Sequence, residues 1–309
     1  MTTTVPHAGI WPALLTPLNA DLSIDIPKFA KHSKALIDGG CAGVTPFGTT
    51  GEGPSFSMAE RRAAIDALIA NGVPAAQILV STSCAALPDT IALTTHAQDV
   101  GAWGVLLMPP FFFKGVADAG IVDSYAQVLD ATADRPLRVV LYHIPQVSGV
   151  ALSAGVIAEL LRRYPQRIVA IKDSAGDRAH SLALAHAFMP SDRPGMGVHV
   201  GHEPDLPTLG RLGSGGAVSG LANFMPRTVR RLVQEPDTAQ AAADLERTER
   251  LLKVLGGYAL IPSLKAIQAM QTGDPAWRRV RAPLVALDDS RYAALQRDLA
   301  PLGLNAAAD

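Results

Sequence analysis

The feature of this sequence that most constrains its fold is a repeated alternation of short apolar segments and longer amphipathic ones. Eight apolar runs are expected to form strands: residues 9–16, 42–48, 78–81, 104–108, 138–145, 167–174, 197–200 and 216–219. Between them lie segments whose apolar residues recur at helical spacing. Such alternation builds a parallel sheet, because each helix returns the chain to the same end of the sheet. Eight repeats predict an α/β fold, a (β/α)₈ TIM barrel, with an open doubly wound sheet as the alternative.

The strand pattern stops near residue 235. Beyond it, residues 239–255, 261–271 and 290–299 have the apolar spacing of helices, and no low-complexity linker precedes them. We therefore expect two parts: residues 1–235 form the barrel, and residues 236–309 form a C-terminal helical extension packed on it.

The composition argues against several kinds of partner. Lys and Arg number 27 against 28 Asp and Glu, and the formal net charge is −1. With no long basic run, we expect neither nucleic acid nor a membrane surface as a partner. The apolar runs are too short to span a membrane, and the first residues lack the charged start of a secretory signal. The two cysteines, Cys41 and Cys84, form no metal-binding or disulfide pattern. These features predict a soluble, cytoplasmic protein.

Two polar residues end neighbouring strands in the middle of the chain. Residues 138–145 and 167–174 are strand candidates, and the segment between them is a helix candidate with Ser153 as its N-cap. Strand, helix and strand make one βαβ unit, so the two strands should be parallel neighbours. Tyr142 and Lys172 should then lie side by side at the carboxyl ends of the strands, where α/β folds place their chemistry.

These two side chains suit carbonyl chemistry. Burial in an apolar cavity lowers the pKa of a lysine, and a neutral amine at Lys172 could attack a carbonyl to form a Schiff base. A nearby phenol at Tyr142 could act as general acid and base. The alternatives are a surface lysine paired with Asp173 and a tyrosine that only packs.

A glycine-flanked pair of hydroxyl residues follows the second strand candidate. Gly48, Thr49 and Thr50 begin the motif GTTGE, which ends at Glu52. Backbone N–H groups and two hydroxyls at such a turn make a cradle for a small carboxylate. A tight turn without a ligand is the alternative, and phosphate is less favoured because no lysine completes a P-loop pattern.

Other polar residues at strand ends are candidates for contact with the far end of a substrate: His143, His202, Glu203 and Ser219. His199 and His202 do not fall on one face of an extended segment, so we expect no metal site. Three consecutive aromatic residues, Phe111 to Phe113, follow the fourth strand candidate and suggest a pocket wall or a subunit contact, with ordinary core packing as the default interpretation.

Three motifs together resemble a known family. GTTGE comes first, Tyr142 and Pro145 form YxxP at the end of the fifth strand candidate, and Lys172 lies in IKDS at the end of the sixth. This order resembles the dihydrodipicolinate synthase and N-acetylneuraminate lyase family. The resemblance implies a (β/α)₈ barrel with C-terminal helices and a homo-oligomer, either a dimer or a tetramer. It also implies class I chemistry on pyruvate or another small-molecule 2-oxo acid, with no cofactor.

The resemblance also implies a role for individual residues. Lys172 would form the Schiff base and Tyr142 would shuttle the proton. Thr49 and Thr50 would hold the carboxylate of the 2-oxo acid, and Thr49 would also take part in the hydroxyl relay. The backbone at Val218 would line the pocket near the lysine.

The sequence departs from the synthases of this family at two places. Val147 lies where synthases carry an arginine that binds the second substrate's carboxylate, and Phe111 and Phe112 lie where they carry a tyrosine. Loss of a bidentate carboxylate ligand weakens selective binding. We therefore expect a lyase, aldolase or dehydratase acting on a 2-oxo-3-deoxy acid. The alternatives are a 4-hydroxy-tetrahydrodipicolinate synthase, with Arg178 in place of the missing arginine, and a non-catalytic regulator that binds 2-oxo acids.

Overall fold

Parallel strands form the centre of the molecule in the computed structural model, which describes residues 8–189 and 196–304. Within these residues the sheet has seven strands, in the order β1-β7-β6-β5-β4-β3-β2. Their bounds are β1 (Gly9–Pro12), β2 (Leu79–Ser81), β3 (Gly104–Leu107), β4 (Val139–His143), β5 (Ile168–Asp173), β6 (Gly197–Val200) and β7 (Gly216–Ser219). Each neighbouring pair is parallel, as the βαβ pattern predicts.

The second strand candidate closes the barrel through two bridged residues, and the Ala42 N–H and the Pro46 carbonyl oxygen add backbone hydrogen bonds to Ile10 at 2.9 Å and Ser81 at 3.2 Å. Thr45 bridges Ala13 beyond the end of β1, and Val44 bridges Ile78 ahead of β2, both in parallel. Gly43 is required here because a Cβ atom would overlap both the Gln77 carbonyl oxygen and the ring of Trp11. The eighth position of the barrel is therefore filled by a short segment squeezed between β1 and β2.

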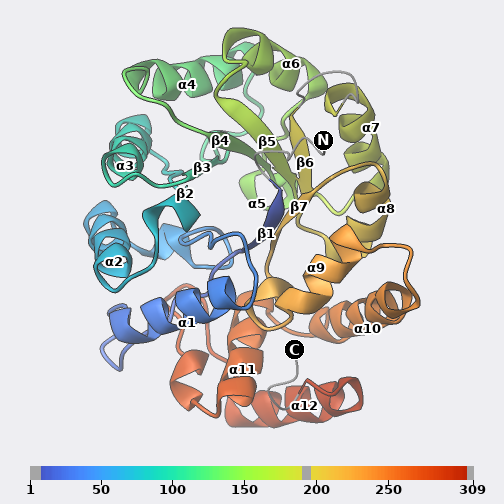
Figure 1. The fold of residues 1–309 in the computed structure, drawn as a ribbon. Helices are drawn as coiled ribbons and strands as arrows, with labels where there is room; N and C mark the ends of the chain where they lie inside the picture. Colours follow the sequence, from blue (N-terminus) through green and yellow to red (C-terminus); the bar gives the residue numbers. More distant parts are fainter. Residues whose placement is uncertain (1–7, 190–195, 305–309) are drawn as a thin grey trace.

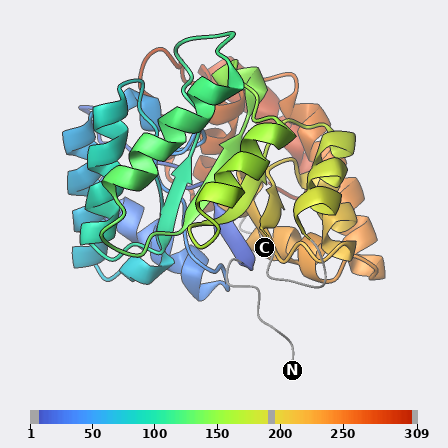
Figure 2. The ribbon, with the colours of Figure 1, turned by 90° about the horizontal axis from the view of Figure 1, so that it is seen from above.

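The strands are surrounded by helices (Figure 1). These are α1 (Ile26–Asp38), α2 (Met58–Ala70), α3 (Leu87–Asp99), α4 (Asp118–Ala131), α6 (Ala154–Arg163), α7 (Arg178–Phe188), α8 (Leu206–Arg211) and α9 (Pro226–Gln234). The one-turn helix α5 (Pro145–Ser148) follows β4 and lies near the centre of Figure 1. Figure 2, turned by 90°, shows helices lying along the outside of the strands. The (β/α)₈ prediction is confirmed in this arrangement.

Local sequence explains where several helices begin. Ser57 accepts a hydrogen bond from the Glu60 N–H at 3.2 Å, and the Glu60 carboxylate accepts one from the Ser57 N–H at 2.9 Å, which is a capping box at the start of α2. Ser153 accepts from the Val156 N–H at 3.1 Å and begins α6 as predicted. The one-turn helix α5 was not predicted; it begins at Pro145, whose fixed φ suits a first helical position.

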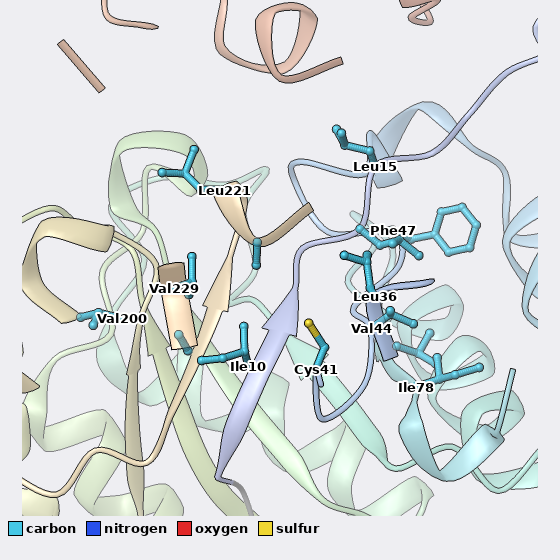
Figure 3. Packing of buried hydrophobic residues seen from close by; sticks show 14 of the residues in the cluster. Ile10, Leu15, Leu36, Cys41, Val44, Phe47, Ile78, Val200, Leu221 and Val229 are labelled. Atoms are coloured by element: carbon cyan, nitrogen blue, oxygen red, sulfur yellow. The ribbon is translucent and has the colours of Figure 1, made fainter. Parts of the chain in front are cut away.

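Two clusters of buried apolar side chains stabilise the barrel. A small cluster fills its interior and includes Trp11, Leu106, Val140, Tyr142 and Val218. A larger cluster lies between strands and helices, and Figure 3 shows part of it around Ile10, Val44 and Ile78. Because side chains alternate along a strand, one face of each strand feeds the interior and the other feeds the helix layer.

Three further helices follow the barrel: α10 (Ala239–Leu255), α11 (Leu260–Thr272) and α12 (Asp289–Leu299). Helix α10 packs against α9, and α12 packs against both α10 and α11 (Figure 1). The boundary that the sequence predicts after residue 235 falls between the end of α9 and the start of α10. Among the helices that the structure describes, none has the length and apolar content needed to cross a bilayer.

Candidate active site

Strands β4 and β5 bring Tyr142 and Lys172 together. The two residues are register partners in the parallel ladder. Tyr142 packs with the interior cluster, and Lys172 is only 5% exposed. The Lys172 Nζ lies 4.3 Å from the centroid of the Tyr142 ring. The amine therefore lies buried against the face of a tyrosine, at the carboxyl ends of two neighbouring strands.

The GTTGE motif adds hydroxyl groups to the same place. Thr49 Oγ1 lies 3.2 Å from the Tyr142 hydroxyl, within hydrogen-bonding distance. A Cβ atom on Gly220, just after β7, would lie 3.5 Å from Thr50 Oγ1, whereas one on Gly48 would meet no atom within 4 Å. Thr49 and Thr50 therefore face the ends of β4 and β7, and the backbone at Gly48 is not crowded.

Glycine after β6 leaves room for the lysine. A Cβ atom on Gly201 would lie 3.1 Å from Lys172 Cε and would overlap Ser174 Oγ. Val218, on β7, lies in the interior cluster with Tyr142. Gly201 was not among the predicted site residues, although a glycine that ends a strand next to the lysine strand is a signal for close approach.

A buried carboxylate binds an arginine and a histidine near the end of β6. Asp205 accepts hydrogen bonds from Arg178 Nε at 2.6 Å and from His202 Nδ1 at 2.9 Å. The bond to Asp205 raises the pKa of His202. Burial alone would raise the pKa of Asp205, but its bonds to His202 and Arg178 hold that pKa below the usual value. Arg178, the alternative ligand for a second carboxylate, is therefore already paired.

Glu203 and Ser219 bind each other. Ser219 Oγ donates to Glu203 Oε1 at 2.6 Å, and the Leu221 N–H donates to the same oxygen at 3.3 Å. Ser219 Oγ in turn accepts from the Ala222 N–H at 3.1 Å. Both side chains are buried. They join the end of β7 to the turn that follows β6.

His143 lies on the opposite face of β4 from Tyr142. Its ring stacks on His180 of α7 with centroids 4.5 Å apart, and its Nδ1 accepts from the Leu152 N–H at 3.1 Å. Burial lowers the pKa of His143, and Asp173 opposes that effect. His143 thus contacts the helix layer, and we leave it out of the substrate site proposed below.

His143, Asp173 and His180 form a cluster that was not predicted from the sequence. One potential metal-ligand atom from each lies within 4.8 Å of the others. Hydrogen bonds already engage them, because the Asp173 carboxylate accepts from His180 Nδ1 at 2.9 Å and from the Ser181 hydroxyl at 2.7 Å. We interpret the cluster as a link between the ends of β4 and β5 and helix α7.

Comparisons with known proteins agree on one family. The model of the dihydrodipicolinate synthetase family matches residues 6–301. An uncharacterized DapA-like lyase of Chloroflexus aurantiacus is 35% identical over 294 residues, which cover 93% of this chain and 94% of the relative.

Two solved structures resemble this one over nearly its whole length. Dihydrodipicolinate synthase from Agrobacterium tumefaciens has a TM-score of 0.88 and 31% identity, covering 95% of this chain and 99% of the other. The Escherichia coli protein YagE, crystallised with pyruvate, has a TM-score of 0.86 and 28% identity, covering 96% and 99%. YagE is named as a candidate 2-dehydro-3-deoxy-D-gluconate aldolase.

Proposed function

The chain belongs to the dihydrodipicolinate synthetase family and is an enzyme of the lyase and aldolase class, and from that premise we propose that it cleaves 2-oxo-3-deoxy acids through a Schiff base on Lys172. One observation carries the proposal: a buried lysine amine lies 4.3 Å from the Tyr142 ring centroid. The hydroxyl of the same tyrosine is within 3.2 Å of Thr49 Oγ1. The proposed nucleophile and the proposed proton carrier are therefore neighbours.

The reaction begins with attack of the Lys172 amine on the C2 carbonyl of the 2-oxo acid. The carbinolamine loses water and becomes a protonated imine, which accepts the electron pair of the C3–C4 bond as that bond breaks. For the loss of water, Tyr142 gives its phenolic proton through Thr49 to the departing hydroxyl of the carbinolamine, and the resulting phenolate takes the proton of the C4 hydroxyl as the aldehyde leaves. Tyr142 returns that proton to C3 of the enamine, and hydrolysis releases pyruvate and the free amine while a proton of the attacking water restores the phenol. Because the imine supplies the electron sink, we propose no cofactor.

The substrate carboxylate is proposed to bind at the GTTGE turn. Thr49 and Thr50 offer hydroxyl donors on the side of the site that faces Tyr142 and Gly220. The backbone of Val218 would line the pocket. His202, next to Gly201, is the candidate for contact with the far end of the substrate, whereas Glu203 and Ser219 would support that loop from within.

Condensation of pyruvate with aspartate semialdehyde is the second candidate. The 31% identity to the Agrobacterium synthase favours it. Against it, the position where synthases carry their arginine is Val147, a half-exposed apolar residue on α5, and Arg178 is bound to Asp205. A valine offers no charge to a second carboxylate, so we place cleavage of 2-oxo-3-deoxy acids first.

Trapping with borohydride tests the Schiff base. We expect pyruvate plus sodium borohydride to leave one covalent adduct on Lys172, located by peptide mass spectrometry, because reduction converts the imine to a stable amine. Lys172→Met should give no adduct and no turnover. Lys34→Met, on the exposed outer helix α1, is the control and should react like the wild type. An unmodified Lys172 at saturating pyruvate would refute the proposal.

The substrate class is tested separately. We would assay a panel of 2-oxo-3-deoxy acids for pyruvate release and, in parallel, pyruvate plus aspartate semialdehyde for condensation. We expect pyruvate release from at least one 2-oxo-3-deoxy acid. The kcat/KM of that cleavage should exceed the kcat/KM of the condensation. Efficient condensation alone would favour the synthase, and an adduct without turnover of any compound would favour a 2-oxo acid-binding regulator.

We also propose that the protein is a homo-oligomer, either a dimer or a tetramer. Phe112 and Phe113 are 70% and 71% exposed in the loop after β3, and their rings pack edge to face at 5.2 Å. Two exposed aromatic rings side by side are typical of a contact surface. Light scattering after gel filtration should give two or four times the mass of the chain.

A further inference from the structure

Glu52, the last residue of the GTTGE motif, is held by the C-terminal extension. Its carboxylate pairs with the ammonium group of Lys265 on α11, and both side chains are fully buried. The second carboxylate oxygen accepts from the Arg281 N–H at 2.9 Å. Lys265 also donates to the Arg279 carbonyl oxygen at 2.6 Å. We call these four groups, on Glu52, Lys265, Arg279 and Arg281, the Glu52 clamp.

The clamp holds the same turn that carries the hydroxyl residues of the site. The Glu52 N–H donates to the Thr49 carbonyl oxygen at 3.1 Å, so Glu52 and Thr49 belong to one tight turn. Glu52 itself has a φ of 58°, a left-handed conformation that a residue other than glycine adopts at some cost. Outside interactions are needed to hold such a turn, and the clamp supplies them from the extension.

Helix α11 meets the site at a second point. A Cβ atom on Gly220 would lie 3.5 Å from Thr50 Oγ1 and 3.6 Å from Leu264 Cδ1. Leu264 and Lys265 are consecutive residues of α11. One residue of this helical turn therefore pairs with Glu52, and the one before it lies near Gly220, as Thr50 does.

Stability alone does not account for a charged pair here. Removing two charges from water is costly, and an apolar pair of similar volume often stabilises a protein as well or better. Burial lowers the pKa of Lys265, and Glu52 opposes that effect. A charged pair does give a directed, fixed geometry, which an apolar pair lacks.

We propose that Glu52 and Lys265 are positioning residues of the active site: the clamp sets Thr49 against Tyr142 and Thr50 toward the substrate carboxylate. The C-terminal extension is then part of the catalytic apparatus, although none of its residues need touch the substrate. This inference rests on the proposed function, because the role of Thr49 and Thr50 belongs to that proposal.

The test compares single variants that remove one charge of the clamp with a double variant that removes both. Lys265→Met leaves the Glu52 charge and the Arg279 carbonyl unpaired. We expect the pyruvate concentration for half-maximal borohydride trapping, and KM for the 2-oxo acid, to rise roughly tenfold, about 1.4 kcal/mol of binding. Trapping at saturating pyruvate should still reach completion, because Lys172 is untouched. Glu52→Gln supports the same comparison if Lys265→Met does not fold.

The double variant Glu52→Gln with Lys265→Met is the rescue. This variant removes both charges together, so no buried charge is left without its partner, and the amide oxygen of the introduced glutamine can still accept from the Arg281 N–H. The pyruvate concentration for half-maximal borohydride trapping should return to within a few-fold of the wild-type value. A double variant with the Tm of the wild type but the KM of Lys265→Met would contradict the proposal.

Asp244→Asn provides the matched control. Asp244, buried on α10, accepts from Nε of the partly exposed Arg231 on α9 at 2.6 Å, and neither residue belongs to the clamp or to the GTTGE turn. This variant should lower Tm and leave KM unchanged. If Lys265→Met also lowers Tm without changing half-saturation, the clamp is only structural and the inference is wrong.

Hydrogen exchange separates this inference from the proposed function. The peptide covering residues 48–53 should exchange faster in Lys265→Met than in Asp244→Asn, whether or not pyruvate reacts. If the wild type forms no adduct on Lys172, the proposed function is refuted, while the exchange rates still decide whether the clamp orders the turn. Equal exchange in the two variants would refute the clamp even with a normal adduct.

Discussion

Tyr142 and Lys172 meet because each ends a short β-branched run and the two runs flank one helix. The sequence therefore predicts that they are neighbours, and the ladder pairs them directly. The direction of the adjacent side chain is harder to anticipate at a strand end. His143 follows Tyr142 and points to the other face of β4, where it stacks on His180. The ring on which His143 stacks comes from α7, 37 positions along the chain, and no local sequence pattern predicts that contact.

Replacing Tyr142 by phenylalanine tests the hydroxyl without removing the ring that packs against Lys172. We expect kcat for cleavage to fall by roughly 10²- to 10⁴-fold, because general acid–base catalysis at one position contributes about that much. The borohydride adduct on Lys172 should still form. Steady-state kinetics and mass spectrometry measure the two effects, and a kcat within a few-fold of the wild type would remove Tyr142 from the proton relay.

At the scale of elements, most strands could be predicted because a strand buried on both faces is a continuous apolar run. Residues 42–48 fit that pattern, yet among the described residues only Val44 and Thr45 of this run form ladder bridges. Gly43 lets the run approach Gln77 and Trp11, where a Cβ atom would overlap both. The pattern of one run does not contain these neighbours, so it does not predict how many of its residues pair.

The link between the GTTGE turn and α11 was beyond sequence reasoning for a different reason. Glu52 and Lys265 are 213 residues apart, and each is unremarkable in its own segment. A lysine in an amphipathic helix is normally on the solvent side, but Lys265 has no exposed surface. Only the way that α11 packs against the barrel shows that these charges are partners.

The close approach of the segment after β6 to β5 gives a prediction at this scale. Gly201→Ala would place a methyl group 3.1 Å from Lys172 Cε and in overlap with Ser174 Oγ, so the lysine or the segment must shift. We expect the rate of adduct formation with pyruvate to fall at least roughly tenfold, the effect of about 1.4 kcal/mol on a barrier. Gly120→Ala in α4, where a Cβ atom meets nothing within 4 Å, is the control. Equal trapping rates in both variants would contradict the expected crowding.

For the whole molecule, the extension and the barrel are joined by polar contacts as well as by the apolar core. Arg281 donates to the Glu60 carboxylate at 2.5 Å and to the Ser55 carbonyl oxygen at 2.9 Å, and its guanidinium lies 4.2 Å from the centroid of the Phe56 ring. The hydrogen bond from Arg281 lowers the pKa of Glu60 to about 2. These contacts surround the start of α2, directly after the GTTGE turn, so the extension and the turn are expected to unfold together.

His32 makes the stability of this assembly depend on pH. It lies buried on α1, with Nε2 3.1 Å from Asn223 Oδ1, and its ring meets the edge of Trp277 from the extension at 5.1 Å. Burial lowers the pKa of His32 from 6.5 to about 4, although the bond to Asn223 opposes that effect. The unfolded chain therefore binds a proton that the folded chain refuses between about pH 6.5 and pH 4, and stability must fall as the pH drops through that range.

The size of this effect can be measured with one variant. For His32 the shift corresponds to a loss of roughly 2 kcal/mol in the free energy of unfolding between pH 7.5 and pH 5. His32→Gln keeps an N–H donor for Asn223 but cannot take up a proton. Between pH 7.5 and pH 5 the variant should therefore lose about 2 kcal/mol less unfolding free energy than the wild type. Urea unfolding of both proteins at the two pH values gives the comparison. Parallel losses in wild type and variant would mean that other groups carry the pH dependence and that His32 does not control it.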